Sequence, residues 1–172
     1  MRIELNGCVV RSWRAGDEAA LAQNANNRKV WLNLRDVFPH PYTVEDAAKW
    51  IQSACAETPE LSYAIDVGGM AAGGIGITLL TDVERCTADI AYWLGEPYWG
   101  RGIVTQVVAA VSEYAFVTLD ISRLQAWVFA WNTASMRVLE KCGYVREAVM
   151  RKSAIKDGQL INRMLYARLR DP

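Results

Sequence analysis

The spacing of hydrophobic residues divides the chain into strand-like and helix-like segments. Short apolar or alternating runs predict strands over residues 8–13, 61–67, 71–80, 87–94 and 123–129. Longer segments with apolar residues on one face predict helices over residues 16–26, 43–57, 103–119 and 132–143. The closing segment, residues 144–169, predicts two further strands joined by a tight turn.

Capping and turn residues mark several of these boundaries. Thr43 is a natural N-cap for the second helix, with Asp46 at the third helical position as its capping-box partner. Asn132 is placed to cap the last helix, and Gly143 is placed to end it. The Asp157-Gly158 pair predicts a type I′ turn between the final two strands.

Taken in order, the predicted elements read β-α-α-β-β-β-α-β-α-β-β. This order predicts an α+β fold, a single domain over residues 1–172 built on a mixed, mostly antiparallel sheet flanked by helices. The segment 30–42 is irregular because Pro39 and Pro41 interrupt it. The glycine cluster at 73–77 lies inside a strand pattern and predicts a β-bulge or a close backbone contact.

Charge and composition narrow the possible functions. The chain has 19 Lys and Arg against 19 Asp and Glu, without the basic surplus of a nucleic-acid-binding protein, so we expect no nucleic-acid partner. No apolar run is long enough to cross a bilayer, and residues 1–10 lack a signal-peptide core, so we expect a cytoplasmic protein without membrane contact. We expect no metal, because the thiol and imidazole ligands are dispersed: Cys8, Cys55, Cys86, Cys142 and His40.

The segment "EPYWGRGIVTQ", residues 96–106, carries the candidate chemistry. Gly100 and Gly102 flank Arg101 between a predicted strand and a predicted helix. Backbone N–H groups at a helix start attract an anion, glycines let the anion approach the backbone, and Arg101 adds a charge. The same residues also suit an ordinary tight turn. The dinucleotide-binding fingerprint is incomplete, because Thr105 stands where its third glycine would be.

Three stretches of the chain resemble the GNAT superfamily of N-acetyltransferases. They are "ADIAYWLGEPYWGRGIVTQVV", "NTASMRVLEKCGYVREA" and "KDGQLINRMLYARL", and "LRDVFPHPYTVEDAAKWI" extends the likeness toward the amino terminus. Within the superfamily they look most like the ribosomal-protein N-terminal acetyltransferases of the RimJ/RimL type. The resemblance covers nearly the whole chain and implies a GNAT-type fold with acetyl-coenzyme A as co-substrate.

The resemblance places the superfamily's phosphate motif, Q/R-x-x-G-x-G/A, on residues 99–104. Gly102 matches the motif, whereas Trp99 stands at the Gln/Arg position and Val104 at the final small position. The backbone donors of residues 100–105 survive both substitutions. The residues implied to contact the cofactor phosphates are Trp99, Gly100, Arg101, Gly102, Ile103, Val104 and Thr105.

The resemblance also implies a binding place for the pantetheine arm of the cofactor. In this fold the strand 87–94 splays from the strand 123–129, and pantetheine lies in the gap against free strand backbone. The residues implied to hold it are Tyr92, Trp93, Leu94, Asn132 and Ser135. Buried core packing for the aromatic pair and simple helix capping for Asn132 are the alternative roles.

Two residues are implied to act on protons during acetyl transfer. Ser135 would protonate the leaving thiolate, since Leu139 stands where many superfamily members carry a tyrosine acid. Asp89 would take the proton of the amine through water. The alternatives are an inert surface serine, with the thiolate protonated by solvent, and a strand-edge hydrogen bond for Asp89.

The acceptor is expected to be a primary amine, most naturally the α-amine of a protein. With a pKa of about 7.7–8.0, such an amine is far more often neutral at pH 7 than a lysine with a pKa near 10.4. A small amine, an amino acid or an antibiotic is the alternative acceptor, and a non-catalytic acetyl-coenzyme A-binding module is a third possibility. Either a monomer or a homodimer suits these functions. The residues expected to contact the acceptor are Trp31, Asn33, Arg35, Asp36, His40 and Tyr42.

Overall fold

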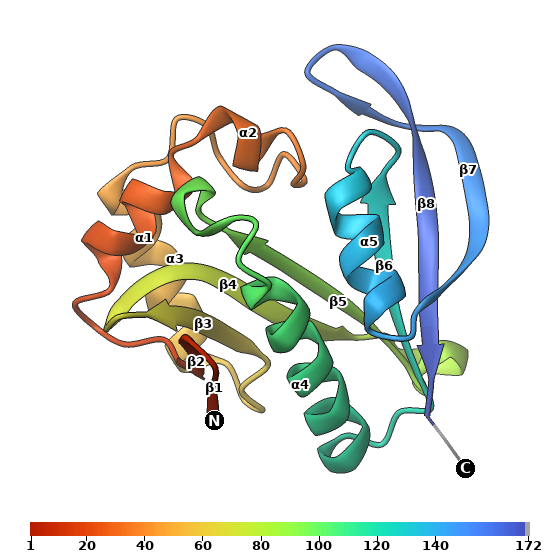
Figure 1. Cartoon of the computed structure of the whole chain (residues 1–172), viewed down its shortest axis with the longest axis horizontal. Coiled ribbons are helices and arrows are strands. Elements are labelled where there is room, and N and C mark those ends of the chain that lie inside the picture. The colour runs from red at the N-terminus through yellow and green to blue at the C-terminus, as the bar shows by residue number, and fades with distance from the viewer. Residues whose placement is uncertain (171–172) are drawn as a thin grey trace. The chain divides into compact units, whose positions relative to one another are not determined.

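A computed structural model describes residues 1–170 of the chain (Figure 1). The chain forms two compact units. The first comprises Met1–Gly76 together with Tyr92–Val107, and the second comprises Ile77–Ala91 together with the chain from Val108 onward. That residues 1–172 act as a single domain stays a prediction.

The described residues form one sheet of eight strands, which hydrogen-bond in the order β1-β2-β3-β4-β5-β6-β8-β7. The strands are β1 (Arg2–Leu5), β2 (Cys8–Ser12), β3 (Ser62–Val67), β4 (Met70–Leu79), β5 (Thr87–Leu94), β6 (Arg123–Phe129), β7 (Val145–Lys156) and β8 (Gln159–Leu169). β5 and β6 pair in parallel, whereas the pairs β1–β2, β2–β3, β3–β4, β6–β8 and β7–β8 are antiparallel. The mixed, mostly antiparallel sheet confirms the predicted α+β class.

Five α-helices and two short 3₁₀ turns accompany these strands in residues 1–170. They are α1 (Glu18–Ala25), α2 (Arg28–Trp31), α3 (Val44–Ala56), α4 (Ile103–Thr118), α5 (Thr133–Lys141), η1 (Asp82–Glu84) and η2 (Glu96–Tyr98). Each predicted helix and strand is present with nearly the predicted ends, and β5 and β6 match residue for residue.

Apart from the two 3₁₀ turns, one strand and one α-helix of the structure are not predicted from the sequence: β1 and α2. Strand β1 has only four residues, too few for a clear pattern, and it pairs with β2 across a turn in which Gly7 has φ +79°. Helix α2 has four residues inside a stretch that appears irregular in sequence. It exists because the Asn27 side chain accepts hydrogen bonds from the backbone N–H groups of Lys29 and Val30.

The predicted caps and the predicted turn are confirmed. The Thr43 hydroxyl accepts from the Asp46 N–H at 3.1 Å, and the Asp46 carboxylate accepts from the Thr43 N–H at 3.0 Å, which completes the capping box. The Asn132 side chain accepts from the Ser135 N–H at 3.1 Å. Asp157 and Gly158 both have positive φ, 51° and 72°, as a type I′ turn requires.

In the first unit, helices α1 and α3 bury their apolar faces against β3 and β4. The core that they form comprises Trp13, Leu21, Ala22, Ala25, Tyr42, Ala47, Ile51, Ala54, Ala64 and Ala71. The predicted close contact at the glycine cluster is present, since a Cβ on Gly73 would overlap the Trp93 carbonyl. The β3–β4 register also shifts between Ile65 and Asp66, which pair with Gly73 and Ala71, so the extra residue of a bulge, Ala72, lies on β4 just before the glycine cluster.

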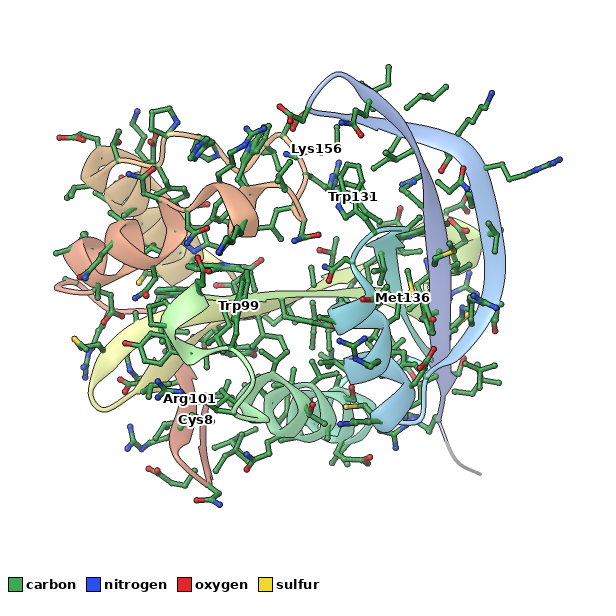
Figure 2. All side chains as sticks on the ribbon, turned by 45° about the horizontal axis from the view of Figure 1, so that its top comes forward. Cys8, Trp99, Arg101, Trp131, Met136 and Lys156 are labelled. Carbon is green, nitrogen blue, oxygen red and sulfur yellow. The ribbon has the colours of Figure 1, made fainter. Side chains whose placement is uncertain are left out.

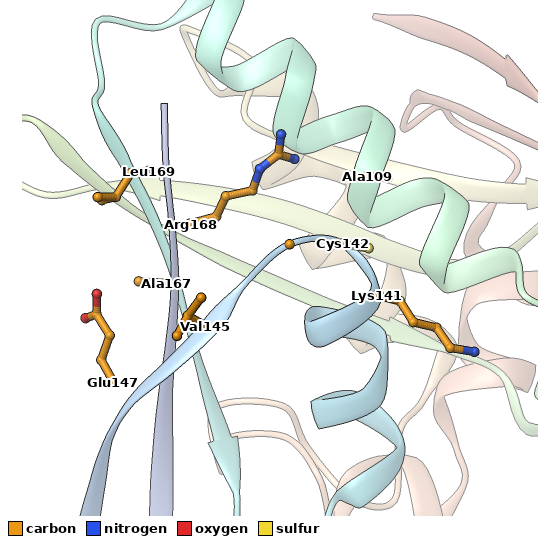
Figure 3. Close-up of a pocket in the computed structure, with 9 residues that line it drawn as sticks. Ala109, Lys141, Cys142, Val145, Glu147, Ala167, Arg168 and Leu169 are labelled. Atoms are coloured by element: carbon orange, nitrogen blue, oxygen red, sulfur yellow. The ribbon is translucent and has the colours of Figure 1, made fainter. Parts of the chain in front are cut away.

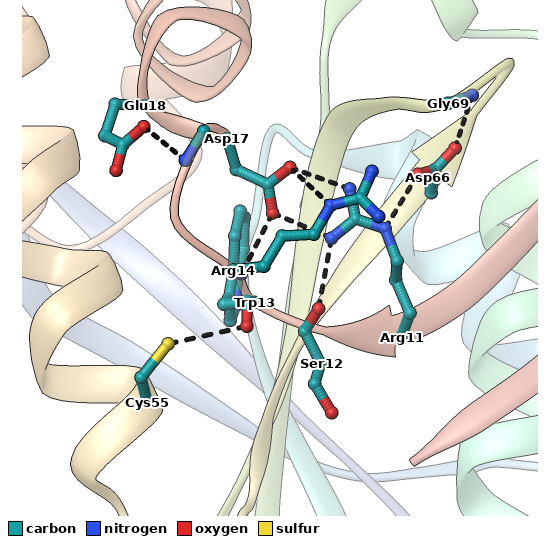
Figure 4. A network of polar contacts seen from close by, with 10 residues as sticks. Arg11, Ser12, Trp13, Arg14, Asp17, Glu18, Cys55, Asp66 and Gly69 are labelled. Carbon is teal, nitrogen blue, oxygen red and sulfur yellow. Dashed lines mark hydrogen bonds and ion pairs between the residues drawn. The ribbon is translucent and has the colours of Figure 1, made fainter.

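A buried ionic network fixes the start of α1 (Figure 4). The Arg11 guanidinium donates to both carboxylate oxygens of Asp17, at 2.7 and 2.8 Å, and to Asp66 at 2.7 Å. All three side chains are less than a tenth exposed. Asp66 also accepts from the Gly69 N–H at 2.7 Å, which shapes the β3–β4 turn. One arginine thus connects β2, β3 and the residue before α1.

In the second unit, polar contacts are added to an apolar core between α4, α5 and the strands β6 and β8. Ser112 is fully buried and donates to the Val108 carbonyl at 2.7 Å, so the Tyr144 hydroxyl, 2.8 Å away, donates to Ser112. The Tyr166 hydroxyl donates to Glu140 of α5 at 2.9 Å. These contacts fasten both helices to the closing β7–β8 hairpin segment.

We expect Asp17→Ala to lower the free energy of unfolding by about 3–5 kcal/mol, because it leaves the buried Arg11 charge without its main partner. Urea unfolding monitored by circular dichroism measures the change. Glu4→Ala is the matched control, since Glu4 pairs with Arg2 at the surface and its loss costs less than about 1 kcal/mol. Equal losses for the two variants would contradict the importance of the buried network.

Candidate functional site

The glycine turn before α4 contains two glycines in a backbone conformation that residues other than glycine rarely adopt. Gly100 and Gly102 both have φ +74°, and a Cβ at either position would meet no atom within 4 Å. These glycines are therefore required by the backbone conformation, and the space beside them is open. The first intrahelical bond of α4 runs from the Gln106 N–H to the Gly102 carbonyl at 3.2 Å. The N–H groups of Ile103 and Val104 precede that bond, at the positive end of the helix.

The side chains of Trp99 and Arg101, labelled in Figure 2, both bond to backbone carbonyls that precede the glycines in the chain. The Trp99 indole Nε1 donates to the Leu94 carbonyl at 2.7 Å, which ties the turn to the end of β5. The Arg101 guanidinium donates to the Pro97 carbonyl at 2.7 Å and lies 5.6 Å from the centre of the Tyr98 ring. Arg101 is exposed, so its charge stands at the open side of the turn. The role of Trp99 as an anchor is not visible in the sequence, because its partner is a backbone atom.

The turn is also attached to α2 through Glu96, the first residue of η2. The Glu96 carboxylate accepts from the Asn27 side-chain amide at 2.8 Å and forms an ion pair with Lys29. These bonds, first from Lys29 and then from Asn27, lower the pKa of Glu96. Sequence reasoning missed this contact, since Glu96 and Lys29 are far apart in the chain.

The three strand residues predicted for pantetheine lie at the carboxyl end of β5. Leu94 is buried, whereas Tyr92 and Trp93 are partly exposed. The Trp93 ring packs edge-on against Phe38, with ring centres 5.5 Å apart, beside the core of the first unit. The parallel ladder between β5 and β6 comprises three residue pairs and ends at Asp89–Gln125. Tyr92, Trp93 and Leu94 therefore follow the point at which β5 leaves that ladder.

The candidate proton acceptor, Asp89, is held at the end of this ladder. It is partly exposed, and its Oδ1 accepts from the Gln125 side-chain amide at 2.9 Å. The strand-edge hydrogen bond considered from the sequence is therefore present. That bond occupies one carboxylate oxygen and orients the group, which is compatible with a role in proton transfer.

Asn132 and Ser135 lie together in the first turn of α5. The Asn132 side chain caps the helix through the Ser135 N–H, and Ser135 is partly exposed. Leu139, one turn further on, is fully buried and supports the core. Both Asn132 and Ser135 thus have fixed backbone positions at the helix start.

The residues predicted for the acceptor separate into three groups. The Trp31 and His40 rings stack with their centres 5.5 Å apart, and the Arg28 guanidinium lies 5.6 Å from the Trp31 ring. Arg35 and Asp36 are exposed. Of the remaining two residues, Asn33 has a side-chain oxygen that is unpaired within residues 1–170, whereas Tyr42 is buried in the core.

Asn33 presents an unusual hydrogen-bond acceptor. Its Nδ2 donates to the Lys29 carbonyl at 2.9 Å, which fixes the orientation of the amide. Its Oδ1 is buried and has no hydrogen-bond partner among the described residues. Because most buried polar groups are paired, an orphaned oxygen here suits a donor supplied by a substrate.

The expected acceptor contact by Tyr42 is corrected by the structure. Tyr42 is 6% exposed and belongs to the core of the first unit, where its ring packs against Phe38. Burial, and next the nearby Asp46 charge, raise the pKa of Tyr42 to about 12. The Tyr42 ring is buried because it belongs to the same apolar core as Ala47 and Ile51 of α3.

The second unit has a pocket of ≈ 620 Å³ that does not coincide with these residues (Figure 3). It lies at the carboxyl end of α5, and Lys141, Cys142 and Arg168 are among the residues that line it. Burial raises the pKa of the Cys142 thiol, which disfavours a nucleophilic thiolate there. None of the residues predicted to contact the cofactor or the acceptor lines this pocket.

Within residues 1–170, no three His, Cys, Asp or Glu side chains gather as metal ligands would. None of the helices described combines the length and apolar character needed to span a bilayer.

The family model for the acetyltransferase (GNAT) domain matches residues 8–145. The chain belongs to the GNAT acetyltransferase family. The eight-stranded mixed sheet with its glycine turn ahead of α4 is the architecture expected of that family, so the fold inferred from the sequence is confirmed.

Individual relatives give a more detailed picture. The chain is 43% identical to the probable N-acetyltransferase YjcK of Bacillus subtilis over 42% of its own length. It is 23% identical to the L-amino acid N-acetyltransferase AaaT of Escherichia coli over 94% of this chain and 98% of that protein. The chain spans 40% to 54% of the length of YjcK and of two other curated Bacillus relatives.

A solved structure of RimL, a ribosomal L7/L12 alpha-N-protein acetyltransferase in complex with coenzyme A, has the same fold. Its TM-score is 0.85 at 23% sequence identity, with 98% of each chain covered. At this identity the likeness establishes the fold.

Proposed function

We propose that the protein is an N-acetyltransferase that moves an acetyl group from acetyl-coenzyme A to a primary amine, most naturally a protein N-terminal α-amine. The observation that carries the proposal is the turn at residues 99–105, in which two glycines with φ +74° lead into the first turn of α4. Membership in the GNAT family supports it. The same chemistry suits a cytoplasmic protein, as a monomer or a homodimer, without a metal.

The cofactor's pyrophosphate would bind the backbone N–H groups of residues 100–105. The unobstructed space beside Gly100 and Gly102 lets a phosphate oxygen reach the peptide plane, and the helix start favours its negative charge. Trp99 would hold the turn in place through its bond to the Leu94 carbonyl. Arg101 would add a screened charge near the phosphates, since its guanidinium is exposed.

The pantetheine arm would pair with the backbone of Tyr92, Trp93 and Leu94. The β5–β6 ladder ends before these residues, which supports a role for their backbone in binding an extended ligand. One of their N–H groups would polarise the thioester carbonyl and stabilise the oxyanion of the tetrahedral intermediate. Asn132 would contact the arm while it caps α5.

Acetyl transfer requires a neutral amine, and an α-amine supplies one without a strong base. The amine nitrogen would attack the thioester carbon, forming the N–C bond, and the C–S bond would break. The amine proton would pass through water to Asp89, which Gln125 orients at 2.9 Å. Ser135 would give the leaving thiolate a proton and recover one from solvent.

Several contacts favour a protein acceptor over a free small amine. The stacked Trp31–His40 pair, the exposed Arg35 and Asp36, and the unsatisfied Asn33 oxygen offer an extended set of contacts. RimL, which shares the fold, is described as an alpha-N-protein acetyltransferase. AaaT, which matches along nearly the whole chain, is described as an L-amino acid N-acetyltransferase, so a small acceptor is the second candidate.

A mass-spectrometric assay distinguishes these acceptors. The protein is incubated with acetyl-coenzyme A and a panel of N-terminal peptides, lysine peptides, amino acids and small amines. We expect acetylation of peptide α-amines to exceed that of lysine side chains. Preferential acetylation of free amino acids would favour the small-acceptor alternative, and cofactor binding without any product would favour a non-catalytic binding module.

We expect Gly102→Val to weaken binding of acetyl-coenzyme A by about tenfold or more, which corresponds to a loss of about 1.4 kcal/mol. The branched side chain would stand where a phosphate oxygen approaches the backbone. Isothermal titration calorimetry measures the dissociation constant. Gly7→Val is the matched control, because Gly7 has φ +79° and open space but lies in the β1–β2 turn. Normal binding by a folded Gly102→Val protein would refute the phosphate-turn assignment.

We expect Ser135→Ala to lower kcat by roughly ten- to a hundredfold, at the low end of general-acid effects, because coenzyme A thiolate is a fair leaving group. Affinity for acetyl-coenzyme A should change little, since the pyrophosphate contacts remain. Steady-state kinetics with an active acceptor, together with cofactor titration, measures both quantities. An unchanged kcat would leave protonation to solvent, and a large loss of affinity would make Ser135 a cofactor ligand.

A further inference from the structure

Both carboxylate oxygens of Glu96 are bound by residues at the start of α2. Oε2 accepts from Asn27 Nδ2 at 2.8 Å, and Oε1 pairs with the Lys29 ammonium. The proposed chemistry at the glycine turn does not use Glu96. Nevertheless, this side chain connects two segments that are far apart in the sequence and that carry different parts of the proposed site.

Asn27 joins Glu96 to helix α2, because the same side-chain amide bonds Glu96 and caps the helix. While its Nδ2 donates to Glu96, its Oδ1 accepts from the Lys29 N–H at 2.8 Å and from the Val30 N–H at 3.4 Å. Both ends of the amide are thus in use, and its orientation is fixed. A helix of four residues has little stability of its own, so it depends on the packing of the buried Val30, on its cap and on the group that orients the cap.

At its other end, Glu96 belongs to the turn that holds the glycines. The Glu96 carbonyl accepts from the Trp99 N–H at 3.1 Å, and the Gly95 N–H donates to the Ala72 carbonyl at 2.8 Å. A side chain on Gly95 would overlap Asn24 of α1, so the turn passes closely over that helix. If residues 99–102 became more rigid, the Glu96 backbone would become more rigid too, because its carbonyl is bonded to the Trp99 N–H.

Beyond Lys29, the contacts continue to the acceptor segment. The Lys29 carbonyl holds the Asn33 amide at 2.9 Å, and this amide leaves its Oδ1 without a partner among the described residues. Trp31 is the last residue of α2 and stacks on His40. The order of α2 therefore sets the positions of the aromatic and amide groups expected to meet the acceptor.

We propose that Glu96 is a positioning residue that couples cofactor binding at the glycine turn to the order of α2, so that the acceptor segment is completed only when the cofactor is bound. The inference rests on the proposed function. The ion pair between Glu96 and Lys29 is exposed to solvent and hence weak by itself, whereas the Asn27 bond is partly buried. A cofactor that orders the turn also reduces the entropy lost when Glu96, Asn27 and Lys29 come together.

Hydrogen exchange tests the coupling without a known acceptor. Four amides report on α2 and its end, since each donates to a backbone carbonyl: those of Trp31, Leu32, Asn33 and Leu34. We expect coenzyme A to slow their exchange about tenfold in the natural protein and less than about twofold in Glu96→Ala. Because the coupling is reciprocal, the dissociation constant of coenzyme A should rise in the variant by about the same factor as the protection that is lost, up to about tenfold.

Two further variants sharpen the test. Glu4→Ala is the matched control, an exposed ion-paired glutamate on β1, and it should retain the full effect of coenzyme A. Glu96→Gln should recover part of the effect, because its amide oxygen still accepts from Asn27 although the ion pair with Lys29 is lost. If Glu96→Ala fails to fold, Lys29→Met removes only the ion pair and should lose part of the effect, as Glu96→Gln does, because the Asn27 bond to Glu96 remains.

The outcomes separate the inference from the function on which it rests. Failure of the natural protein to bind coenzyme A overturns the proposed function. Binding without slower exchange at α2 overturns only the coupling, as does equal protection in the natural protein and Glu96→Ala. A loss of coenzyme A affinity in Glu96→Ala that greatly exceeds the lost protection, about a hundredfold or more, would make Glu96 a part of the cofactor site and also overturn the coupling. Once an acceptor is known, Glu96→Ala should raise its KM and leave kcat at saturation unchanged.

Discussion

The buried Arg11 guanidinium is the constraint on which the organisation of the first unit depends. Arg11, Asp17 and Asp66 are each removed from water, so each is tolerable only while the other two are present. Satisfying this requirement fixes the start of α1 against β2 and β3. Further along α1, Asn24 donates to the Ala71 carbonyl at 3.1 Å and packs closely on Gly95. A buried network of three charges thus helps to position the backbone from which the glycine turn begins.

Scaffold and site use polar contacts of different strength. The contacts that hold the scaffold are buried, so losing one partner leaves an unpaired group in a medium of low polarity. The contacts around the turn, such as Glu96 with Lys29 and Arg101 with the Pro97 carbonyl, are exposed and compete with water. Strong contacts suit a scaffold that must not move. Weak contacts suit a turn and a short helix that must respond to a ligand.

Local sequence signals predict this fold well, whereas contacts between distant segments escape them. The capping box at Thr43, the Asn132 cap and the Asp157-Gly158 turn depend on neighbouring residues, and all three are present. Helix α2 is not predictable from periodicity, because four residues carry no pattern. The anchoring of Trp99 by the Leu94 carbonyl and the burial of Tyr42 depend on packing that no spacing reveals.

The chain departs from the superfamily's phosphate motif at Trp99 and Val104, and both departures involve side chains and leave the backbone donors of the turn in place. The positive φ of Gly100 and Gly102 is a backbone requirement, which most other residues meet only with strain. Trp99 holds the turn in place through the hydrogen bond from its indole Nε1 to the Leu94 carbonyl. Val104 precedes the first intrahelical bond, so its N–H faces the turn whatever its side chain. A site built from backbone donors tolerates changed side chains as long as the glycines that shape it remain.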